Sequence, residues 1–132
     1  MRLSRILVID DDELNNFALG KFLESYIAPS NYIVQTNGWE AIEHLERCKQ
    51  KKETAPDIIF VDLSMPDMDG FEFLGYYQKN FHAALPKTQL MILTCSTRGT
   101  DEEKALAYSC VKGYLSKPLS DEKMTQILGE EV

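Results

Sequence analysis

Short apolar runs alternate along this chain with longer segments in which apolar residues recur at helical spacing. The runs lack the polar alternation of a half-exposed strand, so they are typical of parallel strands that are covered on both faces. They predict five strands, at Ile6 to Ile9, Tyr32 to Val34, Ile58 to Val61, Leu90 to Leu93 and Val111 to Leu115.

The segments between and after these runs predict five helices, because their apolar residues fall three or four positions apart. The first helix ends before Pro29, the second follows Gly38, and the third follows Gly70. The fourth opens at Thr100, where Glu103 has capping-box spacing, and the fifth starts near Ser120. The residues expected on the buried faces are Leu14, Phe17, Ala18, Phe22 and Tyr26, then Ala41, Ile42, Leu45 and Cys48, then Phe71, Leu74 and Tyr77, and finally Met124, Ile127 and Leu128.

Strict alternation of strands and helices predicts an α/β fold with right-handed crossovers and a doubly wound, five-stranded parallel sheet. The 132 residues fit one domain. The net charge of −7 argues against direct binding to nucleic acid. No stretch is long enough to cross a bilayer, and acidic residues follow the first apolar run, so we expect a soluble, cytoplasmic protein without a membrane partner. The cysteines, Cys48, Cys95 and Cys110, have no metal-site spacing, so all three are expected to be small buried residues.

Chemistry-bearing residues follow the expected strands. Asp10 and Asp11 end the first run, Asp62 the third and Thr94 the fourth, and Lys117 comes just after the fifth. The carboxyl ends of parallel strands meet at one edge of the sheet, so these side chains should converge there. Two like charges about 4 Å apart repel by roughly 4 kcal/mol at an effective dielectric of 20, so positive charge must be present.

The ammonium of Lys117 supplies part of that charge, and Mg²⁺, which prefers carboxylate oxygens and water, fits the rest. With both in place, Asp62 could act as a nucleophile toward phosphorus and form an aspartyl phosphate.

The segments "ILVIDDDE", "DIIFVDLSMPDMDG", "LTCS" and "GYLSKP" occur in this order, and together they resemble the receiver domain of two-component response regulators. The resemblance covers nearly the whole chain. It implies a CheY-like (flavodoxin-like) fold with strand order 2-1-3-4-5. It also implies that residues 1–132 form a single receiver domain with no output domain.

The resemblance assigns the site residue by residue. Asp62 resembles the phosphoacceptor, and Asp10 and Asp11 resemble the acidic pair that holds Mg²⁺ together with Asp62. The backbone carbonyl of Ser64, two residues past the acceptor, resembles the third protein ligand of that metal.

Five further positions match the family's pattern. Thr94 resembles the hydroxyl that turns toward the phosphoryl group, Lys117 the phosphate-binding lysine, and Tyr114 the aromatic that changes rotamer with them. Pro118 stands where the family has a cis-proline. Ser96, like Ser64, occupies a position that influences dephosphorylation in this family.

The function expected from this resemblance is that of a stand-alone response regulator, a signalling domain and not an enzyme. A histidine kinase or histidine phosphotransfer protein would phosphorylate Asp62 in a Mg²⁺-dependent reaction. The face formed by the fourth helix, fifth strand and fifth helix would then change its binding to a downstream protein.

Three other functions could use an aspartate or a phosphate site on this fold. A phosphatase of the haloacid dehalogenase type needs a second acid two residues after the nucleophile, where this chain has Ser64. A flavodoxin-like FMN protein needs a Gly, Ser and Thr loop after the first strand, where this chain has "DDDE". A receiver-like interaction domain that is never phosphorylated stays open.

Three residues outside this pattern have structural roles in this interpretation. His44 and His82 are expected to be solvated, and Trp39 to be partly buried.

Overall fold

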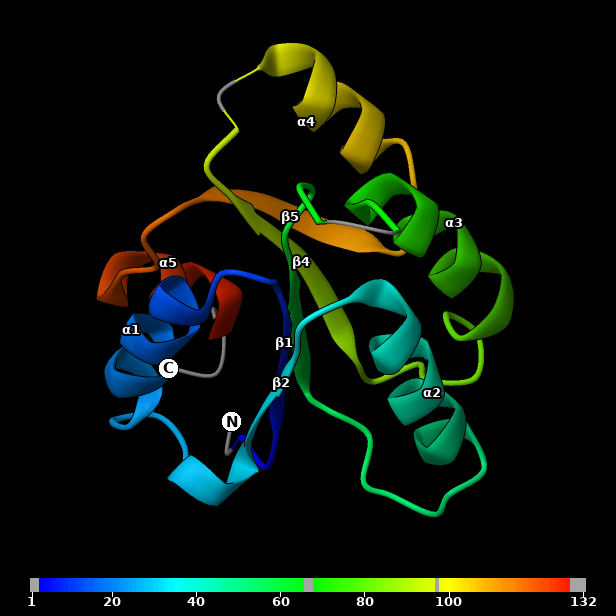
Figure 1. Cartoon of the computed structure of the whole chain (residues 1–132), viewed down its shortest axis with the longest axis horizontal. Coiled ribbons are helices and arrows are strands. Elements are labelled where there is room, and N and C mark those ends of the chain that lie inside the picture. The colour runs from blue at the N-terminus through cyan, green and yellow to red at the C-terminus, as the bar shows by residue number, and fades with distance from the viewer. Residues whose placement is uncertain (1–2, 66–67, 97, 129–132) are drawn as a thin grey trace.

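The computed structural model describes residues 3–65, 68–96 and 98–128 and shows a parallel sheet with helices on both faces (Figure 1). The strands of this described part are β1 (Ile6–Ile9), β2 (Tyr32–Gln35), β3 (Ile58–Val61), β4 (Gln89–Thr94) and β5 (Val111–Ser116). Its helices are α1 (Glu13–Leu23), the short 3-10 helix η1 (Pro29–Asn31), α2 (Gly38–Lys49), α3 (Gly70–Asn80), α4 (Gly99–Leu106) and α5 (Asp121–Leu128).

The strand order is β2-β1-β3-β4-β5, which confirms the doubly wound fold and the order 2-1-3-4-5 expected from the sequence. β1 and β3 run in register, from Ile6 beside Ile58 to Ile9 beside Val61. The residues that follow these two strands, Asp10 and Asp62, are therefore delivered to the same level of the sheet edge.

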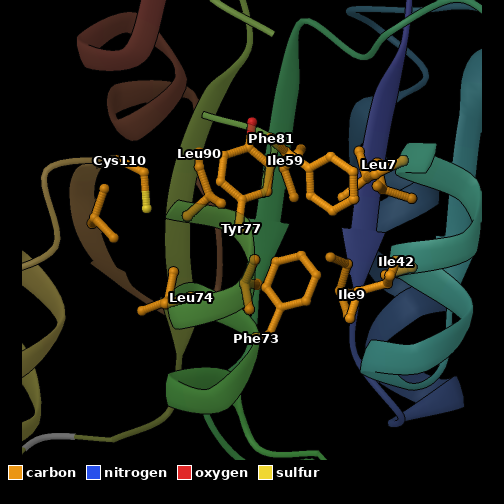
Figure 2. Close-up of a cluster of buried hydrophobic side chains, with 14 of the residues drawn as sticks. Leu7, Ile9, Ile42, Ile59, Phe73, Leu74, Tyr77, Phe81, Leu90 and Cys110 are labelled. Atoms are coloured by element: carbon orange, nitrogen blue, oxygen red, sulfur yellow. The ribbon is translucent and has the colours of Figure 1, made fainter. Parts of the chain in front are cut away.

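The sheet separates two apolar clusters. Helices α2 and α3 cover one face, and α1 and α5 cover the other (Figure 1). Figure 2 shows the first cluster, in which Phe73 and Tyr77 of α3 point toward the strands. The rings of Phe73 and Tyr77 lie 6.0 Å apart and those of Tyr77 and Phe81 lie 5.8 Å apart. Burial of these large aromatic side chains is a main source of stability for the sheet that carries the strand ends.

Helix α1 buries a different face from the one expected. Its inner residues are Asn16, Leu19 and Leu23, whereas Leu14 is 79% exposed and Phe17 is 65% exposed. The expected and the observed inner residues both have helical spacing, and the tertiary contacts of Asn16 determine which of the two sets faces the core. Its side-chain amide donates to the backbone carbonyl of Asp10 at 2.8 Å. The prediction that Leu14 and Phe17 belong to the core was wrong.

Helix α4 begins without the capping box expected at Thr100. Its N-cap is Arg98, whose side chain makes no capping hydrogen bond. A capping box occurs instead at α3, where Asp69 caps the amide of Glu72 and the Glu72 side chain accepts from the amide of Asp69. This box fixes the start of the helix that follows the Asp62 segment.

The environments of two cysteines agree with the prediction and that of the third does not. Cys48 and Cys110 are buried, whereas Cys95 is exposed. Among the residues described, no helix is long and apolar enough to cross a membrane.

Two residues of α2 also differ from expectation. Trp39 is exposed, and His44 is buried rather than solvated. The imidazole Nδ1 of His44 lies 3.6 Å from a carboxylate oxygen of Glu53, which also binds the guanidinium of Arg47. Burial lowers the pKa of His44, and the positive charges of Arg47 and Arg5 add to that effect, while the carboxylate of Glu53 opposes it. The fold therefore favours the neutral imidazole.

We expect this histidine to make the protein less stable in acid. The unfolded chain takes up the His44 proton more readily than the folded chain, so stability should fall as pH drops below about 6.5. Urea unfolding between about pH 7 and about pH 5.5 measures how the free energy of unfolding changes with pH, and His44→Gln should reduce that change. An equal change of stability with pH in His44→Gln would contradict the assignment of this acid sensitivity to His44.

Candidate functional site

The residues predicted to carry chemistry are fixed by backbone hydrogen bonds that continue the strand ladders. The amide of Asp10 donates to the carbonyl of Gln35 at 3.1 Å, and the amide of Asp62 donates to the carbonyl of Ile9 at 3.0 Å. The amide of Lys117 donates to the carbonyl of Thr94 at 2.9 Å. The three side chains therefore start from fixed points at the ends of β1, β3 and β5.

Lys117 joins the two carboxylates. Its ammonium donates to Oδ2 of Asp10 at 2.7 Å and to Oδ2 of Asp62 at 2.8 Å. The side chains are nearly enclosed, with 10% of Lys117, 3% of Asp10 and 10% of Asp62 accessible to solvent. Charge-assisted hydrogen bonds of this kind are short and strong.

Burial and neighbouring charges shift the pKa values of both Asp10 and Lys117. Burial raises the pKa of Asp10 above its ordinary value, although the hydrogen bond from Lys117 opposes the shift, and the charge of Asp62 adds to it. Burial opposes the charge of Lys117 too, yet the two carboxylates hold the pKa of its ammonium above the ordinary value. Two carboxylates share one ammonium, so a second cation at this edge would be stabilised.

The other oxygen of Asp62 faces Thr94. The hydroxyl of Thr94 donates to Oδ1 of Asp62 at 3.0 Å, and the amide of Ser64 donates to the same oxygen at 3.2 Å. Asp62, Ser64 and Thr94 line a hollow of about 440 Å³ together with Ser96 and other residues. The carboxylate of Asp62 thus borders an open space large enough to admit a phosphoryl group.

Asp11 stands apart from this cluster. Its side chain is exposed, and it lines a neighbouring hollow with Ser64, Asp69 and other residues. Within the part of the chain that the structure describes, no three His, Cys, Asp or Glu side chains are close enough together to form a metal site by themselves.

That arrangement still suits Mg²⁺. This ion is usually held by one or two carboxylates and keeps several waters, so it does not require a cage of protein ligands. Asp10 and Asp62 can both contact one cation, because the ammonium of Lys117 already touches both. The donor chemistry and the two carboxylates therefore fit the ion, and the exposed residues Asp11 and Ser64 line the neighbouring hollow.

The residues predicted to form the switch are connected to this hollow by hydrogen bonds. The hydroxyl of Tyr114, on β5, donates to the carbonyl of Ser96 at 3.4 Å, a long hydrogen bond, and its ring is partly buried. The amide of Ser96 donates to the hydroxyl of Thr94 at 3.3 Å. Tyr114 is thus connected to Thr94 through Ser96. The peptide bond between Lys117 and Pro118 is cis, as the resemblance implied.

Four residues that support the site were not predicted from the sequence. Asn15 donates from its side-chain amide to Oδ2 of Asp10 at 3.0 Å, and Asn16 holds the carbonyl of the same residue. Arg98 and Asp101 line both hollows, and Asp101 accepts from the hydroxyl of Ser96 at 2.7 Å. The sequence does not reveal that Asp101, in the first turn of α4, borders the site.

The comparisons with known proteins agree with this geometry. The family model described as "Response regulator receiver domain" matches residues 6–129. A curated relative, the sensor histidine kinase CheAY of Helicobacter pylori, is 30% identical over 96% of this chain and 15% of its own length. The chain spans between 3% and 15% of the length of the first three curated relatives, so it corresponds to one part of each.

Solved structures share the fold. A two-component response regulator from Cytophaga hutchinsonii superposes with a TM-score of 0.87 at 26% identity, covering 98% of this chain and 97% of that one. The Mn²⁺-bound form of the response regulator Rcp1 superposes with a TM-score of 0.73 at 21% identity, covering 95% and 88%.

Proposed function

The chain belongs to the response regulator receiver family, and from that premise we propose that Asp62 accepts a phosphoryl group from a histidine kinase or a histidine phosphotransfer protein. The observation that carries the proposal is the placement of Asp62. Its carboxylate is held between the Lys117 ammonium and the Thr94 hydroxyl and borders an open hollow.

In the proposed reaction, an oxygen of Asp62 forms a bond to phosphorus as the bond between phosphorus and the donor's histidine nitrogen breaks. The electron pair of that bond stays on the imidazole. Lys117 is placed to balance charge on the transferred group, because its ammonium already contacts the attacking carboxylate. The amide of Ser64 and the hydroxyl of Thr94 are donors for the other oxygens.

Asp10 and Asp62, with Asp11 and the Ser64 carbonyl beside them, would hold Mg²⁺. When bound, this ion supplies positive charge that the two carboxylates and the incoming phosphoryl group lack. Rcp1, a fold neighbour, has a solved Mn²⁺-bound form, which supports binding of a divalent cation by this fold.

The residue two positions after Asp62 also favours a signalling role over a catalytic one. Ser64 offers no carboxyl to activate water at the position where a haloacid dehalogenase phosphatase carries its second acid. The phosphoryl group should therefore persist on Asp62 instead of turning over as in an enzyme. The curated relatives include histidine kinases, the class of protein that would supply it.

The donor is proposed to dock across α1. Leu14 and Phe17 expose large apolar side chains on this helix, which starts directly after Asp10 and Asp11. Exposed apolar residues beside a reactive group are typical of a protein–protein contact. The stand-alone state of the chain and its lack of an output domain stay predictions.

Phosphorylation is proposed to act through Thr94 and Tyr114. A phosphoryl group on Asp62 adds acceptor oxygens, so the Thr94 hydroxyl would turn toward it and release its contact with the Ser96 amide. Tyr114 would then move, and the surface of α4, β5 and α5 would bind its target differently. Leu106 of α4, 45% exposed, supports a contact surface there.

Thr94→Ala should separate phosphorylation from switching. Without the hydroxyl, Asp62 should still bind beryllofluoride with Mg²⁺, but amide shifts in α4, β5 and α5 should respond much less than in wild type. Two-dimensional NMR of labelled protein measures both effects. Thr94→Ser retains the hydroxyl and should respond as wild type does. A full response in Thr94→Ala would argue against this switch.

A further inference from the structure

The edge of the sheet opposite Asp62 carries a hollow that the proposed function does not use. It has a volume of about 590 Å³ and lies between the connection from α2 to β3 and the connection from α3 to β4. In Figure 1 the first of these is the loop that runs below α2. Apolar and basic residues line it: Cys48, Ala55, Pro56, Ala84, Leu85 and Pro86, with Lys49, Lys51, Lys52 and Lys87.

The acidic residues at this hollow are already engaged. Asp57 accepts hydrogen bonds from the backbone amides of Ser4 and Arg5. Glu53 binds the guanidinium of Arg47 at 2.5 Å. Arg47 therefore balances the charge of Glu53, and the remaining negative charge of Asp57 offsets only one of the four lysines.

The four lysines have no ion-pair partner among the residues that the structure describes, and all four are exposed. Lys49 has a structural explanation, because it lies in the last turn of α2 and its ammonium is 5.8 Å from the centre of the Phe81 ring. Lys51, Lys52 and Lys87 have no such structural explanation. In a chain with a net charge of −7, this local group of positive charges is distinctive.

Lys51 has an unusual backbone for its residue type. Its φ of 64° is left-handed, and it ends α2 in a Schellman motif, with the amide of Lys51 bonded to the carbonyl of Cys48 and that of Lys52 to the carbonyl of Arg47. Glycine adopts this conformation without strain, whereas lysine does not. A lysine at this position is unfavourable for the backbone alone, which points to a use for its side chain.

We propose that this hollow binds an acidic peptide segment of a partner protein that also carries aliphatic side chains. The lysines complement the acidic groups, and the apolar lining suits the aliphatic ones. Among the described lining residues there is no arginine fork and no aromatic ring, the groups best suited to phosphate and to nucleotide bases, so a peptide fits better than a nucleotide.

This site is independent of phosphorylation. Asp57 borders the hollow just before β3 begins, and Asp62 follows the other end of that rigid strand. Binding at one edge of the sheet therefore leaves the Asp62 edge free. The segment would tether a partner to the receiver in both signalling states.

The test measures fluorescence anisotropy of a labelled peptide in which Glu and Asp alternate with Leu. We expect saturable binding to the wild-type protein, weakened by salt and changed less than about twofold by beryllofluoride with Mg²⁺. The double variant Lys52→Glu with Lys87→Glu should raise the Kd about tenfold or more. Lys21→Glu with Lys112→Glu makes the same change in net charge elsewhere on the surface and should leave the Kd nearly unchanged.

Lys51→Gly separates binding from folding. It should fold at least as stably as wild type, because glycine suits the left-handed position, yet bind the peptide more weakly. The proposal is overturned if the peptide fails to saturate at millimolar concentration, or if both double variants bind alike. Binding of pyrophosphate or anionic vesicles through the same lysines, without peptide binding, would overturn it in favour of those ligands. None of these results depends on phosphorylation of Asp62.

Discussion

Replacing Lys117 by methionine should destabilise the protein by about 3 kcal/mol, because it leaves two nearly enclosed carboxylates without their shared cation. Lys117 contacts Asp10 at 2.7 Å and Asp62 at 2.8 Å, and burial already disfavours the charge of Asp10. Methionine keeps most of the side-chain volume, so the effect reports the lost charge and not a cavity.

Two comparisons make this measurement specific. Lys112→Met changes an exposed lysine near the start of β5, the strand that leads to Lys117, and should alter stability little. Mg²⁺ should restore more stability to Lys117→Met than it adds to wild type, since a divalent cation can replace the missing ammonium. Urea unfolding with and without Mg²⁺ measures both, and a Lys117→Met protein as stable as wild type would refute the argument.

Gly70→Ala should destabilise the fold by about 2 kcal/mol and slow phosphorylation of Asp62. A Cβ at Gly70 would lie 2.6 Å from Cα of Leu63 and 2.8 Å from the carbonyl oxygen of Asp62. These are backbone atoms, which cannot turn away as a flexible side chain would. The start of α3 or the segment after Asp62 must therefore move.

Gly75→Ala is the matched control in the same helix. A Cβ there meets nothing within 4 Å, so the change should stabilise α3 by about 0.5–1 kcal/mol. Chemical denaturation compares the two variants, and the rate of phosphorylation by acetyl phosphate reports on the site. If both variants shift stability in the same direction, the close approach of Gly70 to the backbone of Asp62 and Leu63 is not what constrains this position.

Strand positions could be predicted because a buried parallel strand depends on a short, continuous stretch of the sequence. A run such as Ile58 to Val61, buried on both faces, needs continuous apolar residues, and the observed strands differ from the expected ones by single terminal residues. The site residues Asp10, Asp62, Thr94 and Lys117 come together because parallel strands end at one edge. Their contacts follow from topology, which the pattern predicts well.

Other features depended on tertiary partners that no pattern reveals. Asn16 is buried because it bonds the carbonyl of Asp10, and this selects the inner face of α1 over the equally periodic Leu14 and Phe17. His44 is buried beside Glu53, a residue of the following loop. The Schellman motif that ends α2 at Lys51 could not be predicted either, because this motif prefers glycine to lysine.

The most direct test of the central claim is the intact mass of the protein after incubation with acetyl phosphate. We expect one added phosphoryl group in the presence of Mg²⁺, far less with EDTA, and none in Asp62→Asn. Asp57→Asn, which alters an aspartate at the opposite end of β3, should still be phosphorylated. An unmodified wild-type protein that also fails to bind beryllofluoride, or equal phosphorylation of Asp62→Asn, would contradict the assignment of Asp62 as the phosphoacceptor.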